Sequence, residues 1–391
     1  MIVEEQSDMG GVQHSTLFLA KSLSKLNYIS SRVLLPSKGM MSSAFDNASI
    51  KYILYNKIKY SSTSISLGND RIRIINPFSY IYNIVAIILN ALSIRAILKI
   101  HYADIVLTKG LGNHFSCSLA CKMMNKKVIW HLQDLISDRY FGILQFIINM
   151  SANILADFVI CDGQLIKDSL WGKAYENSKV VFNGVSVGDF KMSDNSRFLT
   201  RSELNIPQQA YVIGNVARFT PWKGQRYLVE AFIEYSKLNN NAFLLLVGSP
   251  LFDNGAYYNE LQELVKINQI TDRVIMPGYR TDLQNIFSSI DLFAYPSIEK
   301  DTTPLSLISA LSSGLSTVVS NIPSLYEVVS RFKYVKTFDP NNAQKLISLF
   351  QEYENINTRK SHGINNHINA KKYFSIETHT KEMLNILLKN N

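Results

Sequence analysis

Short apolar runs alternate with segments of helical spacing along the whole chain. In the first half the candidate strands are Ile2-Val3, Ser31–Leu35, Tyr52–Tyr55, Ile105–Thr108, Val128–His131 and Phe158–Cys161, and helical spacing runs over Ser15–Leu26 and Ile84–Ile100. This alternation is typical of βαβ units, which build parallel sheets. Ligands of such folds bind at the carboxyl ends of the strands, and most of these runs lead into polar or glycine-bearing loops.

The pattern starts again near residue 210. The candidate strands are Tyr211–Ala217, Phe243–Val247, Val274–Met276, Leu292–Tyr295 and Thr317–Ser320, and the candidate helices are Gln225–Leu238, Tyr257–Asn268, Leu283–Ser288 and Leu305–Ser313. The polar stretch 184–208 between the two halves predicts a linker, and Ile376–Leu388 predicts an amphipathic helix near the C-terminus. A chain of 391 residues is long enough for two such domains.

One stretch, Ile81–Ile100, is apolar over nearly the length of a membrane span. The polar residues Asn83, Asn90, Ser93 and Arg95 interrupt it, so we expect a buried or interfacial helix rather than a span. A second apolar stretch, residues 141–156, is too short to cross a bilayer. The opening residues do not form a signal peptide, and Ile2-Val3 predicts a late start site or a short edge strand.

Composition excludes several classes of protein. Hydrophobic residues make up 47% and charged residues 18% of the chain, which excludes global disorder. Cys117, Cys121 and Cys161 are too few for a disulfide framework, so we expect buried thiols in a reducing cytosol. The net charge of +9 lies mostly in the first 185 residues, but no dense basic run indicates nucleic acid. A membrane surface or a phosphorylated substrate fits this charge better.

Two segments of the second half carry candidate chemistry. Arg218 and Lys223 follow a predicted strand and precede a helix, where two cations and a helix N-terminus suit a diphosphate. An ordinary surface pair of cations is the alternative. Downstream, a strand ends in an acidic loop that leads into a helix, and Thr302 and Thr303 stand at the helix start. They can donate hydrogen bonds to a ligand, or simply cap the helix.

The ordered set of motifs resembles the retaining glycosyltransferases of family 4. The motifs run Gly10-Gly11, His131, Phe182-Asn183-Gly184-Val185, Arg218 with Lys223-Gly224, Leu246-Val247-Gly248, Pro277-Gly278-Tyr279-Arg280, and the acidic loop with the helix that ends at Gly314. The resemblance covers almost the whole chain and implies the α/β GT-B fold, in which two Rossmann-like domains face each other across a cleft. We expect an acceptor-binding domain at 1–185, a nucleotide-sugar-binding domain at 186–372, and a C-terminal helix at 373–391 that packs back on the first domain.

The resemblance also implies roles for single residues, each named by its number in this chain. The catalytic set is His131, Arg218, Lys223 and Asp301. The donor-binding set is Gly10, Gly11, Gly248, Arg280, Thr302, Thr303 and Ser309. Asn113 and His114, in a predicted loop at residues 110–115, are expected to contact the acceptor. The donor is a UDP- or GDP-sugar, and neither a metal ion nor another cofactor is expected.

The chain departs from the family at one position. The family carries two glutamates eight residues apart, and here Asp301 stands at the first position and Ser309 at the second. A serine cannot make the bidentate, charged contact to the donor ribose, a loss on the order of 1.5–3 kcal/mol of donor binding. Glu299 does not restore the spacing, because Leu307 stands eight residues on. Glu327 matches a further acid of the family, or caps the helix that follows it.

Three hypotheses follow from these residues. The first is a transferase that moves a sugar from the nucleotide to a hydroxyl of a surface glycan or lipid-linked acceptor, in polysaccharide or lipopolysaccharide biosynthesis of the bacterial type. The second is a degenerate, weakly active or non-catalytic protein that binds a partner or glycan, and the third is a sugar-nucleotide epimerase. We expect a cytoplasmic protein that docks on the inner face of the membrane through a basic first half, with Lys51, Lys57, Lys59, Arg71, Arg73, Arg95 and Lys99. A solvated surface is the alternative for those charges.

Overall fold

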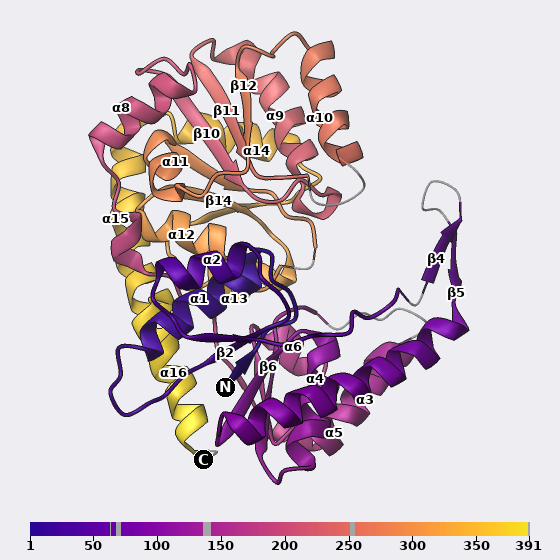
Figure 1. The fold of residues 1–391 in the computed structure, drawn as a ribbon. Coiled ribbons are helices and arrows are strands. Elements are labelled where there is room, and N and C mark those ends of the chain that lie inside the picture. The colour runs from indigo at the N-terminus through magenta and orange to yellow at the C-terminus, as the bar shows by residue number, and fades with distance from the viewer. Residues whose placement is uncertain (63, 68–71, 136–141, 251–254, 300, 390–391) are drawn as a thin grey trace. The chain divides into compact units, whose positions relative to one another are not determined.

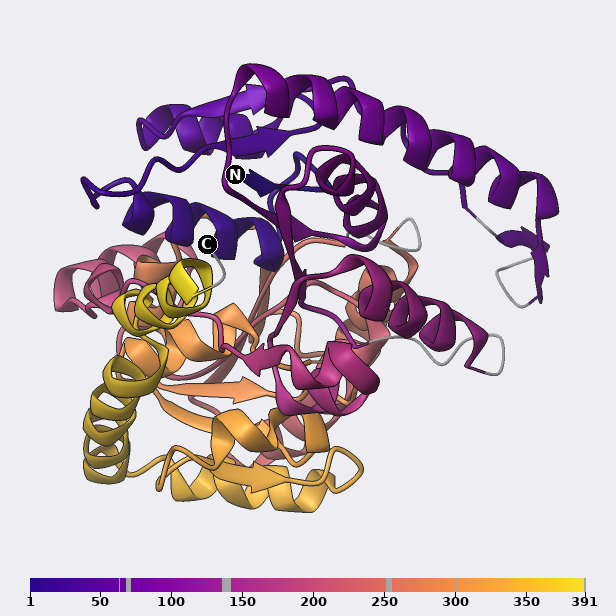
Figure 2. The ribbon, with the colours of Figure 1, turned by 90° about the horizontal axis from the view of Figure 1, so that it is seen from below.

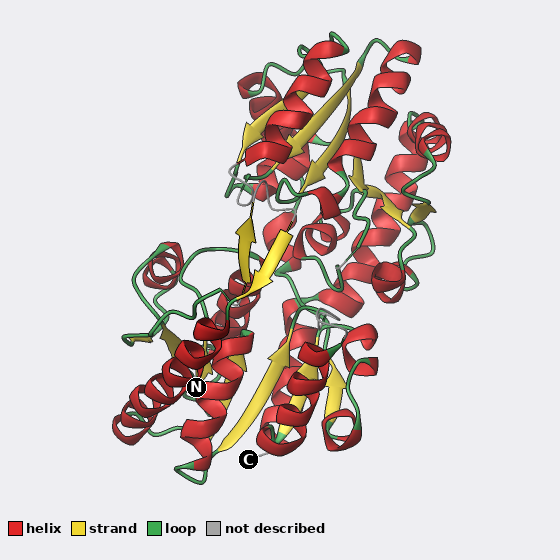
Figure 3. Ribbon diagram, turned by 90° about the vertical axis from the view of Figure 1, so that its right-hand side faces the viewer, coloured by secondary structure: helices red, strands yellow, loops and turns green. Residues whose placement is uncertain are grey.

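The computed structural model describes residues 1–62, 64–67, 72–135, 142–250, 255–299 and 301–389. The chain divides into two compact units. The first unit holds Met1–Phe182 together with His379–Asn391, and the second holds Asn183–Thr378. Each unit is an α/β domain with its own parallel sheet and helices packed beside it (Figure 1, Figure 3).

The first unit is built on a seven-stranded parallel sheet with the strand order β3-β2-β1-β6-β7-β8-β9. Its strands are β1 (Ile2–Val3), β2 (Val33–Leu35), β3 (Tyr52–Leu54), β6 (Ile105–Lys109), β7 (Lys127–Leu132), β8 (Phe158–Cys161) and β9 (Ser178–Val180), and β4 (Ser64–Leu67) pairs with β5 (Ile72–Ile75) in a separate antiparallel ribbon. Its helices are α1 (Gly11–Leu23), α2 (Met40–Asn47), α3 (Pro77–Ile100), α4 (Leu111–Lys122), α5 (Ile143–Leu155), α6 (Gln164–Asp168) and α7 (Gly172–Glu176). The strand order reverses between β1 and β6, which is the topological switch point of a doubly wound sheet.

Two apolar layers hold the first sheet in place, one on each side. Trp130, Ala91 and Ile148 belong to one layer, where α3, α4 and α5 pack, and the buried thiols of Cys117, Cys121 and Cys161 lie in it. Leu19, Phe45 and Ile129 belong to the other layer, with α1 and α2. The prediction that the three thiols are buried is therefore confirmed. Burial raises the pKa of Cys121 and Cys161 to about 12.

The second unit is built on a six-stranded parallel sheet with the order β12-β11-β10-β13-β14-β15. Its strands are β10 (Tyr211–Val216), β11 (Ala242–Val247), β12 (Val274–Gly278), β13 (Leu292–Tyr295), β14 (Ser316–Ser320) and β15 (Lys336–Phe338). Its helices are η1 (Val187–Phe190), α8 (Asp194–Glu203), η2 (Pro221–Lys223), α9 (Gln225–Leu238), α10 (Ala256–Ile267), α11 (Leu283–Ser289), α12 (Leu305–Ser312), α13 (Pro323–Val329), α14 (Ala343–Glu352) and α15 (Ile356–Phe374). The central strands β10, β11, β13 and β14 are buried along their whole length, which explains the continuous apolar sequences of β11 and β13.

The predicted linker at 184–208 is wrong. This stretch contains η1 and α8 and belongs to the second unit, where α8 packs against α11. Phe190 meets Phe287 edge-on at 5.9 Å between ring centroids, and the Ser193 backbone N–H donates to the Ser288 hydroxyl at 3.2 Å. Polar composition was a poor guide here because most of the side chains of α8 face solvent.

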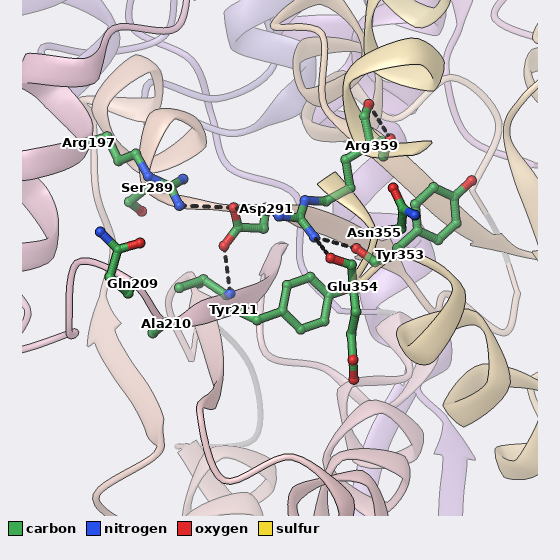
Figure 4. A network of polar contacts seen from close by, with 12 residues as sticks. Arg197, Gln209, Ala210, Tyr211, Ser289, Asp291, Tyr353, Glu354, Asn355 and Arg359 are labelled. Atoms are coloured by element: carbon green, nitrogen blue, oxygen red, sulfur yellow. Dashed lines mark hydrogen bonds and ion pairs between the residues drawn. The ribbon is translucent and has the colours of Figure 1, made fainter. Parts of the chain in front are cut away.

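A buried cluster around Asp291 joins three segments at the amino ends of β10 and β13 (Figure 4). The Asp291 carboxylate accepts hydrogen bonds from Arg197 at 2.9 Å, from Arg201 at 2.8 Å and from the Val212 backbone N–H at 2.8 Å. The Arg201 guanidinium is fully buried and also donates to four backbone carbonyls, those of Pro207, Gln208, Ala210 and Ser289. These contacts fix α8 on the sheet edge opposite to the one where ligands of such folds bind.

The C-terminal helix α16 (Ile376–Lys389) returns to the first unit, as the family resemblance implies. Met383 and Ile386 are buried in the same apolar layer as Leu19 and Phe45. His379 Nδ1 donates to the Phe182 carbonyl oxygen at 2.7 Å, so the helix also closes the end of the first unit's main segment. The expected packing of this helix on the first domain is confirmed.

The helix α3 is long enough and apolar enough to cross a membrane, and no other helix among the described residues is. Only a narrow stripe of it is buried, and that stripe packs on α4. Ala91, Ile94 and Leu98 of the stripe belong to the core of the first unit. The helix is therefore part of the domain along one side, in agreement with the prediction of a buried or interfacial helix.

Candidate active site

Arg218 and Lys223 lie in the loop at the carboxyl end of β10, as the sequence predicts. Gln225, the first residue of α9, donates to the Arg218 carbonyl oxygen at 2.8 Å and so joins the two ends of this loop. Gly224 has φ +70°, and a Cβ atom there would lie 2.0 Å from the Pro296 carbonyl oxygen. The Lys-Gly pair is thus required for the loop after β10 to pack on the loop after β13.

Lys223 and Asp301 form an ion pair at this edge of the second sheet. Lys223 Nζ donates to Asp301 Oδ1 at 2.5 Å and to the Tyr295 hydroxyl at 3.0 Å. The Tyr295 hydroxyl donates to Asp301 Oδ2 at 3.0 Å, and the Ser297 hydroxyl donates to the same oxygen. Burial, and then the Asp301 charge, raise the pKa of Tyr295, while the positive charge of Arg218 acts in the opposite direction. Tyr295 and Ser297 complete the cluster; both belong to the strand end that leads into the acidic loop, but the sequence assigned neither of them a role.

Gly248 supports the same loop from the neighbouring strand. It directly follows β11, and its backbone N–H donates to the Gly278 carbonyl oxygen at 3.0 Å. A Cβ atom at Gly248 would lie 1.9 Å from the Ala217 carbonyl oxygen. Any side chain at this position would displace the segment that carries Arg218, which accounts for glycine there without a direct contact to a ligand.

Thr302 and Thr303 are buried just before α12, but neither caps that helix. Its N-cap is Pro304, which makes no side-chain capping hydrogen bond. Asn183 donates to the Thr303 carbonyl oxygen at 3.3 Å and so fixes the entry into the helix. Ser309 lies in α12 and is almost fully buried, and its carbonyl oxygen accepts from Ser313. Position 309 therefore faces the interior of the second unit with a small neutral side chain.

Arg280 is bound by two carboxylates within the second unit. Its guanidinium donates to Asp282 at 2.7 and 2.8 Å and also pairs with Glu203. The hydrogen bonds that Arg280 donates to these two acids raise the pKa of Arg280 and lower the pKa of Asp282 and Glu203. This arrangement links the loop after β12 to α8. These contacts are enough to explain Arg280 without a contact to the donor. Glu327 lies inside α13, so it does not cap a following helix.

His131 is the last residue but one of β7 in the first unit, and it is buried. Its Nε2 atom lies 2.6 Å from Asp162 Oδ1, and Asp162 directly follows the neighbouring strand β8. Burial lowers the pKa of His131, although Asp162 acts in the opposite direction. A neutral imidazole then donates its Nε2 proton to Asp162 and keeps the lone pair on Nδ1, an atom that has no hydrogen-bond partner among the described residues.

Glu4 and Lys109 extend this polar row across the switch point of the first sheet. Lys109 ends β6 directly beside His131, and Glu4 follows β1. Glu4 accepts from Thr16 and, at 3.4 Å, from Gln13, whereas the buried Nζ atom of Lys109 has no hydrogen-bond partner in the part of the chain that the structure describes. Burial raises the pKa of Glu4 and lowers that of Lys109. The sequence analysis missed Glu4, Lys109 and Asp162, although each stands at the carboxyl end of an apolar run.

Asn113 and His114 do not lie in a loop, and that prediction is wrong. Both lie in the first turn of α4, which begins at Leu111, and both are buried. His114 Nδ1 lies 2.5 Å from the Thr108 hydroxyl, and the imidazole stacks on Trp130 at 4.8 Å between ring centroids. Asn113 donates to the Lys109 carbonyl oxygen at 3.2 Å. These contacts dock α4 on β6 and β7.

Gly10 and Gly11 form the turn into α1, where Gly10 is the N-cap. Neither residue has a left-handed backbone, so the turn itself does not require glycine. A Cβ atom at Gly11 would meet nothing within 4 Å. Glycine there leaves open space beside the helix N-terminus, as a close approach of a ligand to the backbone requires.

No group of three His, Cys, Asp or Glu residues placed to hold a metal ion occurs in the part of the chain that the structure describes. The positive charge at the second sheet comes instead from Arg218 and Lys223. Arg71, one of the cations expected to face a membrane, lies outside the described residues.

Comparison with known proteins agrees with this geometry. Residues 196–369 match the model of the family described as "Glycosyl transferases group 1". A segment of 145 residues is 30% identical to the Escherichia coli enzyme UDP-Gal:alpha-D-GlcNAc-diphosphoundecaprenol alpha-1,3-galactosyltransferase, and covers 37% of this chain and 36% of that enzyme. A segment of 179 residues is 24% identical to the E. coli O-antigen biosynthesis glycosyltransferase WclY, over 46% of this chain and 47% of WclY. The matches thus span less than half the length of these relatives.

Solved structures confirm the fold over the whole chain. The Anabaena HepE protein in complex with UDP and glucose superposes with a TM-score of 0.82, at 19% identity, over 99% of this chain and 98% of HepE. Staphylococcus aureus TarM, solved with UDP among its ligands, superposes with a TM-score of 0.70, at 14% identity, over 98% of each chain. The fold is therefore the GT-B fold of glycosyltransferases, with two parallel-sheet α/β domains, as the sequence predicts.

Proposed function

We propose that this protein is a retaining glycosyltransferase of family 4 that takes a sugar from a UDP- or GDP-sugar. The acceptor is a hydroxyl of a surface glycan or lipid-linked sugar, in polysaccharide or lipopolysaccharide biosynthesis of the bacterial type. The observation that carries the proposal is the Lys223–Asp301 pair, which stands with Arg218 at the carboxyl edge of the second sheet. This edge lies within the segment that matches the family model. The E. coli relative named for UDP-Gal and the UDP in HepE favour UDP over GDP.

The second unit binds the nucleotide in this proposal, and the first unit binds the acceptor. Arg218 and Lys223 contact the diphosphate and stabilise the negative charge that develops as the nucleoside diphosphate leaves, without the help of a metal ion. Asp301 holds Lys223 in place and accepts hydrogen bonds from sugar hydroxyls through its partly exposed carboxylate. His131 lies near the reacting sugar and accepts a hydroxyl proton at Nδ1. Gly10 and Gly11 let the backbone of the first unit approach the donor.

The protein works on the cytoplasmic side of the membrane in this proposal. The first half of the chain carries most of the positive charge, and the acceptor of the first E. coli relative is an undecaprenol-linked sugar. Anionic lipids of the inner leaflet attract such a domain.

The test is a thermal-shift screen of the purified protein with UDP, GDP, ADP and their common sugar conjugates. We expect one nucleotide class to raise the melting temperature, and we expect Arg218→Ala and Lys223→Ala to abolish that rise. Lys237→Ala is the matched control, because Lys237 is an exposed lysine of α9 that pairs with Glu234 on the same helix. A folded protein that responds to none of the nucleotides would contradict the proposal.

Ser309 favours a second candidate function, a GT-B protein that has lost turnover and binds a partner or glycan. The family's ribose-binding carboxylate is replaced here by a small neutral side chain in α12. The variant Ser309→Glu separates the two functions. A large gain in transfer would show decay of an ancestral site, whereas no gain together with measurable wild-type transfer would show a site that works without this carboxylate. Turnover of the nucleotide sugar with no acceptor present would instead indicate the epimerase.

A further inference from the structure

The helix α3 has its polar and apolar sides reversed relative to a helix on a water-exposed surface. A surface helix normally buries an apolar stripe and presents polar side chains to water. The buried stripe of α3 contains the small or polar residues Ser79, Ala86, Asn90 and Ala91 as well as Ile94 and Leu98. Figure 1 and Figure 2 show α3 running along the outside of the first unit, beyond α4.

Two asparagines of α3 direct their side-chain amides to the protein. Asn90 accepts from the Ile58 backbone N–H at 2.8 Å and donates to the Ile58 carbonyl oxygen at 3.0 Å. Asn83 forms the same pair of bonds with Ser61, at 2.7 and 2.9 Å. These two amides therefore bind the extended segment before β4 and do not make the outer side of the helix polar.

The outer side of α3 is apolar over most of its length. Ile81, Ile84, Ile88 and Leu92 are 65%, 58%, 46% and 45% exposed, and Phe78, Tyr80, Tyr82, Val85 and Leu89 are exposed beside them. The helix α5, on the other side of α4, continues this character with exposed Ile143, Phe146, Ile147 and Ile154. Scattered exposed apolar residues need no explanation, but a contiguous set of this size indicates a covered surface.

The charged residues of α3 itself have one sign. From Pro77 to Ile100 the sequence contains Arg95 and Lys99 and no acidic residue. Lys59 and Tyr82 line a shallow hollow beside the start of α3, together with Tyr60 and Ser61. Aromatic residues at the start of the helix and cations along it are the composition of an interfacial helix on anionic lipid.

We propose that α3 docks this protein on an anionic lipid surface, with its axis in the plane of the membrane and its outer apolar side among the acyl chains. The proposal rests on the proposed function in one respect, because a lipid-linked acceptor is what brings a membrane within reach. A second copy of α3 offers no acidic residue to pair with Arg95 and Lys99, whereas anionic headgroups would neutralise them. The inner stripe stays packed in the domain, so the helix lies on the bilayer and does not span it.

The test is co-sedimentation of the full chain with vesicles of phosphatidylcholine alone or mixed with phosphatidylglycerol. We expect binding to the mixed vesicles, and at least about a ten-fold loss of binding in the triple variant Ile81→Ser, Ile84→Ser, Ile88→Ser, since each change removes several methylene groups from lipid contact. The matched control is Leu238→Ser, Ile267→Ser, Ile364→Ser, which alters three equally exposed apolar residues of the second unit. All six positions are exposed, so folding is expected to survive in both variants.

Three results would overturn the proposal. They are wild-type protein that stays unbound with both kinds of vesicle, a triple variant that binds as the control does, and equal binding to the two lipid compositions. A wild-type dimer in light scattering that the α3 variant alone converts to a monomer would also overturn it, and would assign the surface to a second copy. The UDP thermal shift, measured without lipid, reports on the donor site separately. Vesicle binding without a nucleotide response would therefore contradict the proposed function and still support the docking surface.

Discussion

At the scale of single residues, Gly224 is a position where the structure requires glycine. Its left-handed backbone disfavours any side chain, and a Cβ atom would overlap the Pro296 carbonyl oxygen. We expect Gly224→Ala to lower the free energy of unfolding by about 1–3 kcal/mol and to weaken nucleotide binding, because Lys223 moves with the loop. Urea unfolding and the UDP thermal shift measure the two effects.

The control for this variant is Gly188→Ala, at an exposed glycine of η1 whose added Cβ atom would meet nothing within 4 Å. We expect that change to leave both measurements as in the wild type. Equal stability of the two variants would show that the loop after β10 moves freely to accept a side chain, and that the packing on Pro296 does not position Lys223.

At the scale of elements, the contacts of Asp291 determine how firmly α8 is held on the second sheet. We expect Asp291→Asn to cost about 3–5 kcal/mol in the free energy of unfolding, because the buried Arg201 loses its carboxylate partner. Urea denaturation measures this cost, with Glu260→Gln as the control. Glu260 also pairs with an arginine, Arg226, but both side chains are about half exposed, so we expect less than about 1 kcal/mol there. Similar costs for the two variants would contradict the structural role of the cluster.

The elements that the sequence predicted best are those with continuous apolar runs. Phe158–Cys161, Leu292–Tyr295 and Gln225–Leu238 have the predicted bounds, because complete burial of a strand or a regular apolar stripe leaves a clear pattern. The helix α15 was missed because it is polar and rich in asparagine, and only a few positions such as Ala370 and Phe374 are buried. The short strands β9 and β15 were missed because only one of the three residues in each is buried, which leaves no apolar run in the sequence.

The candidate site shows the same division between local and distant information. Arg218, Lys223 and Asp301 could be found because their spacing along the chain follows a family pattern. Tyr295 binds Lys223 only because β10 and β13 are neighbours in the sheet, although the two residues are 72 positions apart in the sequence. Asp162 approaches His131 in the same way, across two adjacent strands. Such partners become visible only when the strand order is known.

At the scale of the whole molecule, the first unit is expected to be sensitive to acid. Burial lowers the pKa of His114 to about 3 and that of His379 to about 4, from an ordinary value of 6.5. Below pH 6.5 the unfolded chain binds protons at these residues that the folded chain does not, so the free energy of unfolding falls as the pH falls. At pH 5 each histidine accounts for a loss of ~2 kcal/mol. Glu4 acts in the opposite direction, because burial raises its pKa above 4.5.

A histidine variant isolates this effect from that of Glu4. In His379→Gln the side-chain amide still donates to the Phe182 carbonyl oxygen, but it cannot take up a proton. The loss of unfolding free energy between pH 7 and pH 5 should then be ~2 kcal/mol smaller than in the wild type. Urea unfolding at the two pH values measures it, and equal losses in the two proteins would show that His379 is not kept neutral by burial.

The division of labour between the two units can be tested by hydrogen exchange with and without UDP. A ligand stabilises only the states that bind it, by ~2.7 kcal/mol when its concentration is 100 times the dissociation constant. If the second unit binds the nucleotide, amide exchange should slow most in the loop after β10, at residues 217–225, and after β13, at residues 296–299. The central strands β6, β7 and β8 of the first unit should change little. Lys223→Ala should remove the protection and Lys237→Ala should keep it, because only the first of these lysines is bound to Asp301. Protection confined to the first unit would move the nucleotide to the row of Glu4, Lys109 and His131, and would reverse the roles proposed for the two domains.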